Sequence, residues 1–448
     1  MKHVYIRTFG CQMNVYDTGK MRALLAADGY QPTEDPDEAD LVIVNTCSVR
    51  EKPEHKLHSF LGDMRAIKRR RPLTLAVAGC VAQQEGKALL DRYPDVDLVM
   101  GPDAIPQIRA LVAEAGQRRV LDTDFLERDD YVFASELDPS DRGVGAFVTI
   151  QKGCDNKCTF CVVPFTRGPE ISRSSAEILD EVRALVARGA REITLLGQNV
   201  NSYGLKVPGE LSFAQLLTAV AAVPGVERIR YTTSHPRDMG ADVVQAYRDL
   251  PQLTSHLHLP VQSGSDRVLR RMKRFYTREH FLGVVAALTD ARPDLALTTD
   301  LIVGFPGETD EDFRATLSLV DEVGFHNAFS FKYSPRPLTA ALKLVDRDEV
   351  PDEVASARLT ELQALLRKHA LRRNREIEGQ TLDVLVEGPS AHDEGVVCGR
   401  TSTNKMINFP GSLELVGQTV SVRVTRAFTN SLRGELPARP DSPFYASL

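Results

Sequence analysis

No stretch of apolar residues in this sequence is long enough to cross a bilayer as a helix, and no segment has low complexity. The first residues, "MKHVYIRTFGCQ", lack the apolar h-region of a secretory signal peptide. Because thiols stay reduced in the cytoplasm, clustered cysteines there suit metal binding or catalysis better than disulfides. We therefore expect a cytoplasmic protein that does not interact with membranes.

An excess of positive charge is also absent, since the net charge of the 448 residues is −6. Bulk charge therefore gives no prediction of nucleic-acid binding. Three short runs are nevertheless basic: "RAIKRRR" (65–71), "RVLRRMKR" (267–274) and "LRKHALRRNR" (366–375). They are either solvated helix faces or places where a polyanion docks across more than one domain.

The chain is too long for one ordinary core, and its pattern divides it into three segments. In the first, about 1–130, short runs rich in β-branched residues alternate with helix-length stretches. This rhythm predicts a doubly wound, open parallel sheet with helices on both faces. Its strand candidates are 3–10, 41–46, 74–79 and 96–101.

The second segment, about 140–375, continues the strand–helix rhythm and ends in a long basic helix at about 352–377. Six strands with crossover helices predict a partial, TIM-like (β/α)6 barrel, with its site at the carboxyl ends of the strands. The strand candidates are 146–151, 192–197, 228–233, 256–261, 295–304 and 328–333.

The third segment, 378–446, consists of short β runs broken by glycines. This composition predicts a small antiparallel β-barrel. The segment is too short for an enzyme domain and has the size of a binding module. The segment carries no excess of basic residues, so a role in RNA binding would depend on its shape more than on its electrostatic potential.

Cys11, Cys47 and Cys80 each follow a predicted strand of the first segment. In a parallel sheet such positions share the carboxyl edge, where ligands bind in open α/β folds. Three buried free cysteines are the alternative, since cysteine is commonly buried. The shared position in the strand–helix repeat favours one metal cluster held by all three thiolates.

A second trio, Cys154, Cys158 and Cys161, has the spacing C-x3-C-x2-C in a loop at the mouth of the predicted barrel. A structural zinc site needs four ligands, and no histidine occurs between residues 59 and 234. A remote ligand stays possible. Alternatively, three thiolates hold three irons of a cubane, and the open fourth iron binds a small molecule. Cys398 is isolated and reads as a small core residue.

C-x3-C-x2-C after the first strand of such a barrel resembles the radical S-adenosylmethionine (SAM) superfamily, with Phe160 at the aromatic position of the motif. The resemblance implies that SAM occupies the open iron and is cleaved to a 5′-deoxyadenosyl radical. Cys154, Cys158 and Cys161 would then be the catalytic ligands.

Several stretches are implied by this resemblance to contact SAM. "TDLIVGFPGET" (299–309), with Gly304 and Phe305, resembles the segment that holds adenine and ribose. Glu170 and Arg173 could hold the amino and carboxylate ends of SAM, or form a surface ion pair. Gln198 and Asn199 follow a strand, and they either reach the ligand or cap the next helix.

The order of a three-cysteine α/β domain, a radical SAM barrel and a small β module resembles the methylthiotransferase family along nearly the whole chain. The third module would be the RNA-binding TRAM domain. "TFGCQMNVYDT" (8–18), "CTFCVVPFTRGPEISR" (158–173) and "GRTSTNKMINFPG" (399–411) resemble the branch that acts on N6-isopentenyladenosine at tRNA position 37.

The family resemblance implies two [4Fe-4S] clusters with different tasks. An auxiliary cluster on Cys11, Cys47 and Cys80 would present a sulfur that one SAM methylates, and the radical cluster would cleave a second SAM. The product would be the 2-methylthio nucleoside. We expect a monomer that takes electrons from a reductant such as a flavodoxin or ferredoxin. The alternatives are a relative acting on threonylcarbamoyl-adenosine or a ribosomal protein aspartate, or a non-catalytic iron–sulfur RNA-binding regulator.

Overall fold

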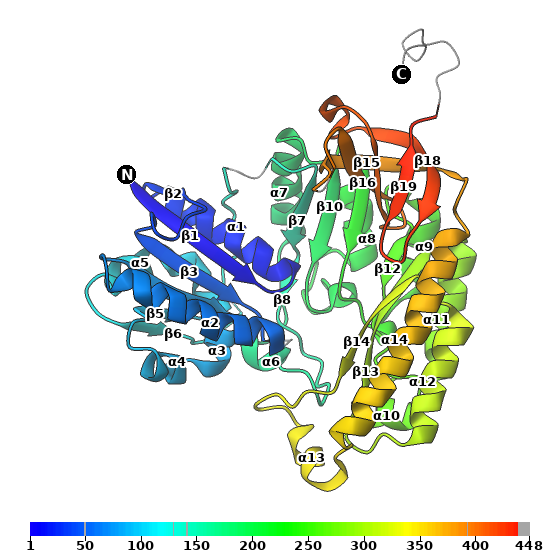
Figure 1. Cartoon of the computed structure of the whole chain (residues 1–448), viewed down its shortest axis with the longest axis horizontal. Coiled ribbons are helices and arrows are strands. Elements are labelled where there is room, and N and C mark those ends of the chain that lie inside the picture. Colours follow the sequence, from blue (N-terminus) through cyan, green and yellow to red (C-terminus); the bar gives the residue numbers. More distant parts are fainter. Residues whose placement is uncertain (49–50, 129, 140–141, 392, 438–448) are drawn as a thin grey trace.

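The computed structural model describes residues 1–48, 51–128, 130–139, 142–391 and 393–437, which form three packed units (Figure 1). The end of the third predicted segment, at residue 446, therefore lies outside the described residues. No helix in these ranges is long and apolar enough to span a membrane.

The amino-terminal unit is a six-stranded parallel sheet in the order β2-β1-β3-β4-β5-β6. The central strands are continuous apolar runs because helices cover both faces, α1 and α5 on one and α2, α3 and α4 on the other. The short edge strands β2 and β6 were not predicted. The elements are β1 (Lys2–Phe9), α1 (Gln12–Ala26), β2 (Tyr30–Pro32), β3 (Leu41–Thr46), α2 (Glu51–Lys68), β4 (Thr74–Gly79), α3 (Cys80–Glu85), α4 (Lys87–Arg92), β5 (Leu98–Met100), the 3-10 helix η1 (Pro102–Gln107), α5 (Ile108–Ala115) and β6 (Val120–Asp122).

The central unit contains the six predicted barrel strands as two parallel three-stranded sheets, β7-β10-β11 and β12-β13-β14. A parallel bridge from Ile229 to Leu253, just before β12, continues the curve between them. The strands are β7 (Gly145–Thr149), β8 (Gln151–Lys152), β9 (Ile171–Ser172), β10 (Glu192–Leu196), β11 (Arg228–Tyr231), β12 (His256–His258), β13 (Ala296–Val303) and β14 (Asn327–Lys332).

Helices cover the outer face of this open barrel, and α14 packs along β14 (Figure 1). Ser174, Ser212, Thr277 and Thr309 each start one of these helices by accepting a hydrogen bond from its first turn. The helices are α6 (Val163–Thr166), α7 (Ser175–Ala187), η2 (Val200–Ser202), α8 (Phe213–Ala221), η3 (Pro236–Asp238), α9 (Ala241–Asp249), α10 (Asp266–Arg271), α11 (Arg278–Ala291), α12 (Asp310–Val323), α13 (Leu342–Asp348) and α14 (Asp352–Arg375).

The carboxyl-terminal unit is a closed five-stranded barrel in the order β15-β16-β17-β19-β18. Its pairings are antiparallel except that β17 and β19 pair in parallel, which modifies the all-antiparallel expectation. The elements are β15 (Thr381–Pro389), β16 (Val396–Thr401), β17 (Met406–Pro410), η4 (Leu413–Leu415), β18 (Thr419–Ala427) and β19 (Leu432–Glu435).

This small barrel docks at the amino ends of the central strands, away from their carboxyl ends. Arg230 on β11 donates to the carbonyls of Thr401 (2.8 Å) and Ser402 (3.1 Å), and Arg228 donates to the carbonyl of Asp383 (3.1 Å). The backbone N–H of Ser255, just before β12, donates to the Ser402 hydroxyl. The turn between β16 and β17 therefore closes the floor of the central barrel.

Candidate functional site

The structure brings Cys11, Cys47 and Cys80 together at the carboxyl edge of the first sheet. Cys11 is the N-cap of α1, Cys47 follows β3, and Cys80 opens α3, so the trio follows three adjacent strands. The Cys47 thiol hydrogen-bonds both other sulfurs. These bonds are the main reason that the pKa of Cys11 falls to about 6 and that of Cys80 to about 7, while the pKa of Cys47 is raised.

A buried arginine from the central unit lies beside this trio. Arg167 follows α6, which packs against α3, and its guanidinium donates to Asp17 of α1 at 2.6 Å. Its positive charge contributes to lowering the pKa of Cys11 and of Cys80. The pair connects the first cysteine trio to the loop that follows the second.

The second trio lies in the loop between β8 and α6. Gly153 has φ +72°, and a Cβ there would lie 1.9 Å from the carbonyl oxygen of Pro169, so only glycine fits. Burial raises the pKa of Cys154 to about 11 and that of Cys161 to about 12. At neutral pH such thiols become thiolates only when a bound metal or a nearby cation stabilises the negative charge.

Contacts from the segment after α10 hold this loop. The guanidinium of Arg274, itself buried, donates to the Cys158 sulfur at 3.5 Å. The backbone N–H of Thr159 donates to the carbonyl of Met272 and its hydroxyl to that of Arg271 (both 3.0 Å). The loop therefore has a fixed support and a cation beside one thiol.

The donor chemistry of both trios suits iron–sulfur clusters. Within the described ranges, no group of three or more His, Cys, Asp or Glu side chains is placed to hold a metal ion, as a closed zinc site would be. In a cubane each thiolate binds a different iron, so three thiols can serve one cluster without converging on a single point. Each trio offers the three thiols that such a cluster needs.

Glu170 lies against the second trio. Its backbone N–H donates to Asp155 in the cysteine loop, and its carboxylate accepts from Ser202 (2.8 Å) and Lys206 (3.2 Å). Burial raises the pKa of the carboxyl, and its charge acts on the pKa of Cys154. A polar ligand at the cluster would find this carboxylate within the site.

Arg173 faces the first unit. Its guanidinium pairs with Glu181 of α7, which also pairs with Lys20 of α1 at 2.8 Å, and all three side chains are buried. Glu170 and Arg173 therefore do not form the surface ion pair considered from the sequence: Glu170 pairs with Lys206, and Arg173 pairs with Glu181 inside the central unit. Lys20 connects that buried pair to the first unit. The role of Arg173 in holding SAM stays a prediction.

Gln198 and Asn199 carry buried polar atoms without partners. Among the described residues, both polar atoms of the Gln198 side-chain amide and the Asn199 side-chain oxygen have no hydrogen-bond partner, although Asn199 donates to Asp238 at 2.7 Å. An unpaired buried amide costs free energy, which a polar ligand would recover. Neither residue caps a helix by a side-chain hydrogen bond.

Gly304 and Phe305 begin the loop after β13. Gly304 has φ +70°, and a Cβ there would meet the Ala355 Cβ of α14 at 2.6 Å. In this structure the backbone of Gly304 therefore lies close to helix α14. Phe305 is fully buried, and Phe160 of the cysteine motif packs against the same cluster. The loop after β13 thus packs against the cysteine motif through this apolar cluster.

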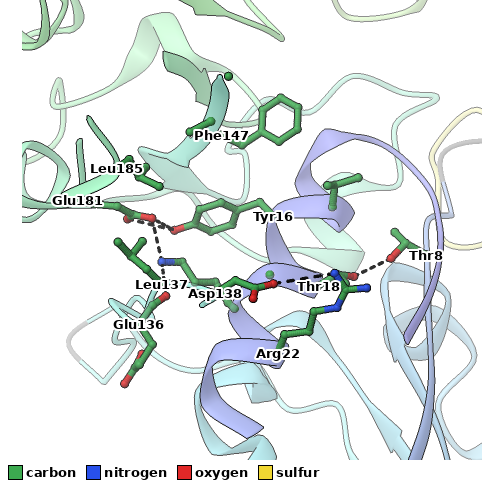
Figure 2. A pocket seen from close by; sticks show the side chains of 15 residues that line it. Thr8, Tyr16, Thr18, Arg22, Glu136, Leu137, Asp138, Phe147, Glu181 and Leu185 are labelled. Atoms are coloured by element: carbon green, nitrogen blue, oxygen red, sulfur yellow. Dashed lines mark hydrogen bonds and ion pairs between the residues drawn. The ribbon is translucent and has the colours of Figure 1, made fainter. Parts of the chain in front are cut away.

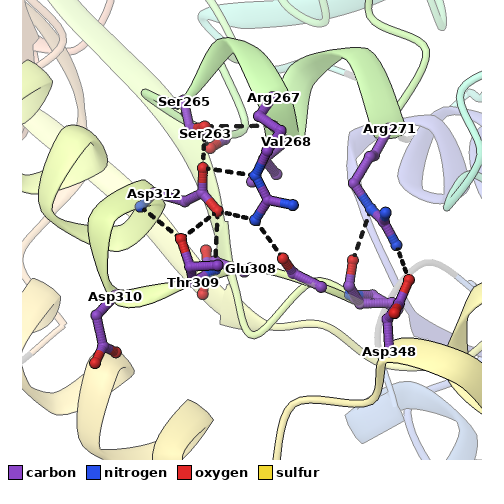
Figure 3. Close-up of polar contacts among 12 residues, drawn as sticks. Ser263, Ser265, Arg267, Val268, Arg271, Glu308, Thr309, Asp310, Asp312 and Asp348 are labelled. Atoms are coloured by element: carbon purple, nitrogen blue, oxygen red, sulfur yellow. Dashed lines mark hydrogen bonds and ion pairs between the residues drawn. The ribbon is translucent and has the colours of Figure 1, made fainter.

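Two arginines of the run 267–274 hold this loop (Figure 3). Arg267 pairs with Asp312 and donates to the carbonyl of Gly307, while Arg271 donates to the carbonyl of Pro306 and pairs with Asp348. In the run 65–71, Arg65, Lys68 and Arg70 likewise pair with carboxylates. Carboxylates of the same chain therefore neutralise much of the positive charge in these two basic runs.

Sequence segments of the chain match three described families. Residues 3–101 match the uncharacterized protein family UPF0004, residues 148–320 the radical SAM superfamily, and residues 375–436 the TRAM domain. The tRNA-2-methylthio-N(6)-dimethylallyladenosine synthase of Geobacter metallireducens is 51% identical over 97% of this chain and 98% of that protein. The enzyme of that name from Geobacter sulfurreducens is 48% identical over 97% of each.

The chain belongs to the radical SAM methylthiotransferase family.

Solved structures agree with this assignment at the level of fold. The radical SAM methyltransferase TsrM from Kitasatospora setae, with cobalamin and a [4Fe-4S] cluster bound, is 14% identical with a TM-score of 0.57, covering 89% of this chain and 81% of that one. The cobalamin-dependent enzyme OxsB gives a TM-score of 0.52. The predicted fold class and family of this methylthiotransferase are confirmed.

The arginines that lie against the two cysteine trios of the methylthiotransferase were not predicted from the sequence. Arg274 was noted only as part of a basic run, and Arg167 was quoted within a motif without a role. The sequence signal that could have indicated them is a basic residue inside an otherwise apolar or turn-forming stretch.

A polar pocket of about 450 Å³ lies away from the cysteines of the methylthiotransferase, between α1, the start of β7 and α7 (Figure 2). Lys20, Glu181 and Tyr16 line one side of it, and Arg22 and Asp138 the other. Its charged groups largely pair with one another, and it is a polar gap between the first and central units.

Proposed function

We propose that this methylthiotransferase converts N6-isopentenyladenosine at tRNA position 37, next to the anticodon, to its 2-methylthio derivative. It would use two molecules of SAM, one as methyl donor and one as source of the 5′-deoxyadenosyl radical. The observation that carries the proposal is the pair of three-cysteine sites, each at a strand-end edge, joined by buried ion pairs. The full-length similarity to enzymes of that name supports the choice of nucleoside.

In this proposal Cys154, Cys158 and Cys161 hold the SAM-binding cluster, and Cys11, Cys47 and Cys80 the auxiliary one. When bound, the two [4Fe-4S] clusters supply the electron that cleaves SAM and the sulfur that is transferred. Arg274 stabilises the Cys158 thiolate by its hydrogen bond. The Glu170 carboxylate, the Gln198 amide and the side-chain oxygen of Asn199 would bind the polar ends of SAM, and the unpaired polar atoms of Gln198 and Asn199 among the described residues support this role.

Three buried ion pairs between the first and second units fix the two sites relative to each other. They are Asp17–Arg167, Lys20–Glu181 and Asp103–Lys152, and every member is largely buried. A buried pair is strongly destabilised when one partner is lost, so the units resist separation. Such rigidity suits transfer between two fixed centres.

The partners follow from the same proposal. The substrate is a tRNA with isopentenylated adenosine in its anticodon loop, and the TRAM domain contributes to binding the RNA. We further propose a monomer in the cytoplasm, supplied with electrons by a flavodoxin or ferredoxin. SAM cleavage by a radical route requires such a one-electron donor.

Anaerobic reconstitution of the wild type and of Cys154→Ala, Cys11→Ala and Cys398→Ala tests the proposal. We expect about eight irons per wild-type chain and about four in each of the first two variants. Cys154→Ala should form no deoxyadenosine, whereas Cys11→Ala should cleave SAM without thiolating tRNA. Cys398→Ala is the control.

Two results would overturn the proposal. A nucleoside digest with a 2-methylthio product on another adenosine would indicate a different substrate. Absence of deoxyadenosine from the reduced wild type would instead favour a non-catalytic regulator.

A further inference from the structure

The five residues Met272 to Tyr276 form a corner in which burial alternates with exposure. Met272, Arg274 and Tyr276 are buried, whereas Lys273 and Phe275 are exposed, Phe275 by 65%. Lys273 and Phe275 both have left-handed backbone angles, φ +55° and +57°. Such angles are unfavourable for bulky side chains, and strain of this kind is concentrated at functional sites.

The corner is attached directly to the C-x3-C-x2-C loop. Arg274, at its centre, donates to the Cys158 sulfur, and the Met272 carbonyl accepts from Thr159. The strained backbone angles of Lys273 and Phe275 therefore accompany the burial of Arg274 between them. The same geometry turns the ring of Phe275 and the ammonium of Lys273 outward beside the cysteine loop.

Other cations lie on the cysteine loop to which this corner is attached. Lys157, between Cys154 and Cys158, is exposed, and no ion pair of Lys157 or Lys273 is present in the part of the chain that the structure describes. Arg237 reaches the same loop through a hydrogen bond to Asn156 at 2.8 Å. Arg237 itself pairs with Asp238, so Lys157 and Lys273 are the cations left for a ligand. Exposed rings and cations of this kind bind unstacked nucleotides, by stacking and by phosphate contacts.

We propose that Phe275 is a stacking platform, and Lys273 a phosphate contact, for an anticodon-loop nucleotide that adjoins the adenosine being modified. This inference builds on the proposed function and adds the surface that holds the RNA at the mouth. The TRAM domain lies at the opposite end of the barrel, so the mouth needs RNA contacts of its own. An unpaired base next to a base drawn into the site is free to stack on Phe275.

The test measures binding of an isopentenylated anticodon stem-loop to the reconstituted full-length enzyme by fluorescence anisotropy. Phe275→Ala should weaken binding roughly tenfold, and Phe275→Trp should retain it. Lys273→Ala should lower the slope of log affinity against log salt by about one. Leu121→Ala, on the distant edge strand β6 and 41% exposed, is the matched control.

Phe275→Gly separates an RNA role from a structural one. Glycine adopts a left-handed angle without strain, so its melting temperature should be unchanged or raised. RNA binding should nevertheless fall as in Phe275→Ala. Parallel loss of stability and binding in Phe275→Gly would mean that the ring supports the fold, and would overturn the proposal.

Two further outcomes also decide the matter. Unchanged RNA affinity in Phe275→Ala, with a wild type that thiolates tRNA, would overturn the platform and leave the proposed function standing. If instead the variants slowed SAM cleavage with flavodoxin but not with dithionite, the surface would dock the reductant. Tight, Phe275-dependent RNA binding with a different product would retain the platform and refute the assigned nucleoside.

Discussion

Two buried arginines, Arg167 and Arg274, each lie against one cysteine trio. Arg274 hydrogen-bonds Cys158, and the charge of Arg167 lowers the pKa of Cys11 and of Cys80. A positive charge near an iron–sulfur cluster stabilises the reduced state, because reduction adds negative charge. Each arginine is therefore a positioning residue whose effect is measurable on the cluster itself.

Arg167→Gln should lower the reduction potential of the auxiliary cluster. Glutamine keeps much of the length but removes the charge and leaves Asp17 buried without its partner, at a cost of about 3–5 kcal/mol of stability. The potential is measured by redox titration with EPR in a chain that lacks Cys154, Cys158 and Cys161.

Asp17→Asn provides the comparison for Arg167. It removes the opposite charge of the same pair, so the potential should move upward. Equal potentials in the wild type and both variants, at equal iron content, would contradict an electrostatic role for Arg167.

Gly153→Ala should abolish the radical cluster and spare the auxiliary one. The added Cβ would lie 1.9 Å from the carbonyl oxygen of Pro169 at φ +72°, so the cysteine loop must move. We expect the variant to bind about half of the wild-type iron and to lose SAM cleavage completely. Gly189→Ala is the matched control, since Gly189 also has a left-handed angle, φ +109°, with nothing within 4 Å. Full iron content in Gly153→Ala would refute this reading.

The spacing of the cysteines made both trios predictable at the residue scale, because strand ends and a short motif are local features. The residues around them were not predictable in the same way. Arg274 lies 116 positions from Cys158, and Arg167 lies 150 positions from Asp17. Only the folded structure shows which cation meets which thiol.

At the scale of elements, helix α1 connects the two units. Its N-cap is Cys11, and it buries Asn14, Asp17, Thr18 and Lys20 in place of a purely apolar face. Asp17 and Lys20 reach the central unit through Arg167 and Glu181. The helix that follows Cys11 is therefore held by ion pairs to the barrel.

Glu181→Gln should loosen α1 from the barrel. Glu181 accepts hydrogen bonds from Tyr16 and Lys20 and pairs with Arg173, so glutamine leaves two buried cations without their anion. We expect about 3–5 kcal/mol lower stability in urea unfolding and faster amide hydrogen exchange in α1. Glu177→Gln is the control, because Glu177 is 55% exposed and lies 3.6 Å from Arg173. Equal effects of the two substitutions would contradict a special role of Glu181.

The long elements followed from their patterns, whereas the two edge strands of the first sheet did not. β3 and β4 coincide with the predicted runs 41–46 and 74–79, since apolar β-branched stretches bounded by turns have few alternatives. The edge strands β2 and β6 have three residues each, too few for any periodicity. The polar buried side of α1 also lacked a signal, because its partners belong to another unit.

At the scale of the whole molecule, the three units were visible in composition but their arrangement was not. The small barrel meets the central one through side chains that bind backbone carbonyls, such as Arg230 with Thr401 and Ser402. Backbone acceptors exist at every residue, so no sequence pattern marks this contact. Its position at the amino ends of the strands is a result of the structure.

Arg230→Gln should undock the TRAM domain while the active site stays intact. The buried Arg230 guanidinium pairs with Glu192 at 2.7 Å and binds both carbonyls of the β16–β17 turn, so its loss frees the turn. Faster hydrogen exchange at residues 401–405 should accompany a lower kcat/KM for full-length tRNA. SAM cleavage without tRNA should persist, because the cysteine loop lies at the other end of the barrel.

Arg191→Gln is the control for Arg230, since Arg191 forms an exposed 3.8 Å pair with Glu227 nearby. If Arg230→Gln increased exchange at residues 401–405 without lowering kcat/KM for tRNA, the docked position of the TRAM domain would be irrelevant to catalysis. The RNA would then be held at the mouth alone. A combined Phe275→Ala and Arg230→Gln variant should lose more tRNA turnover than either single change, because the two contacts lie at opposite ends and act independently.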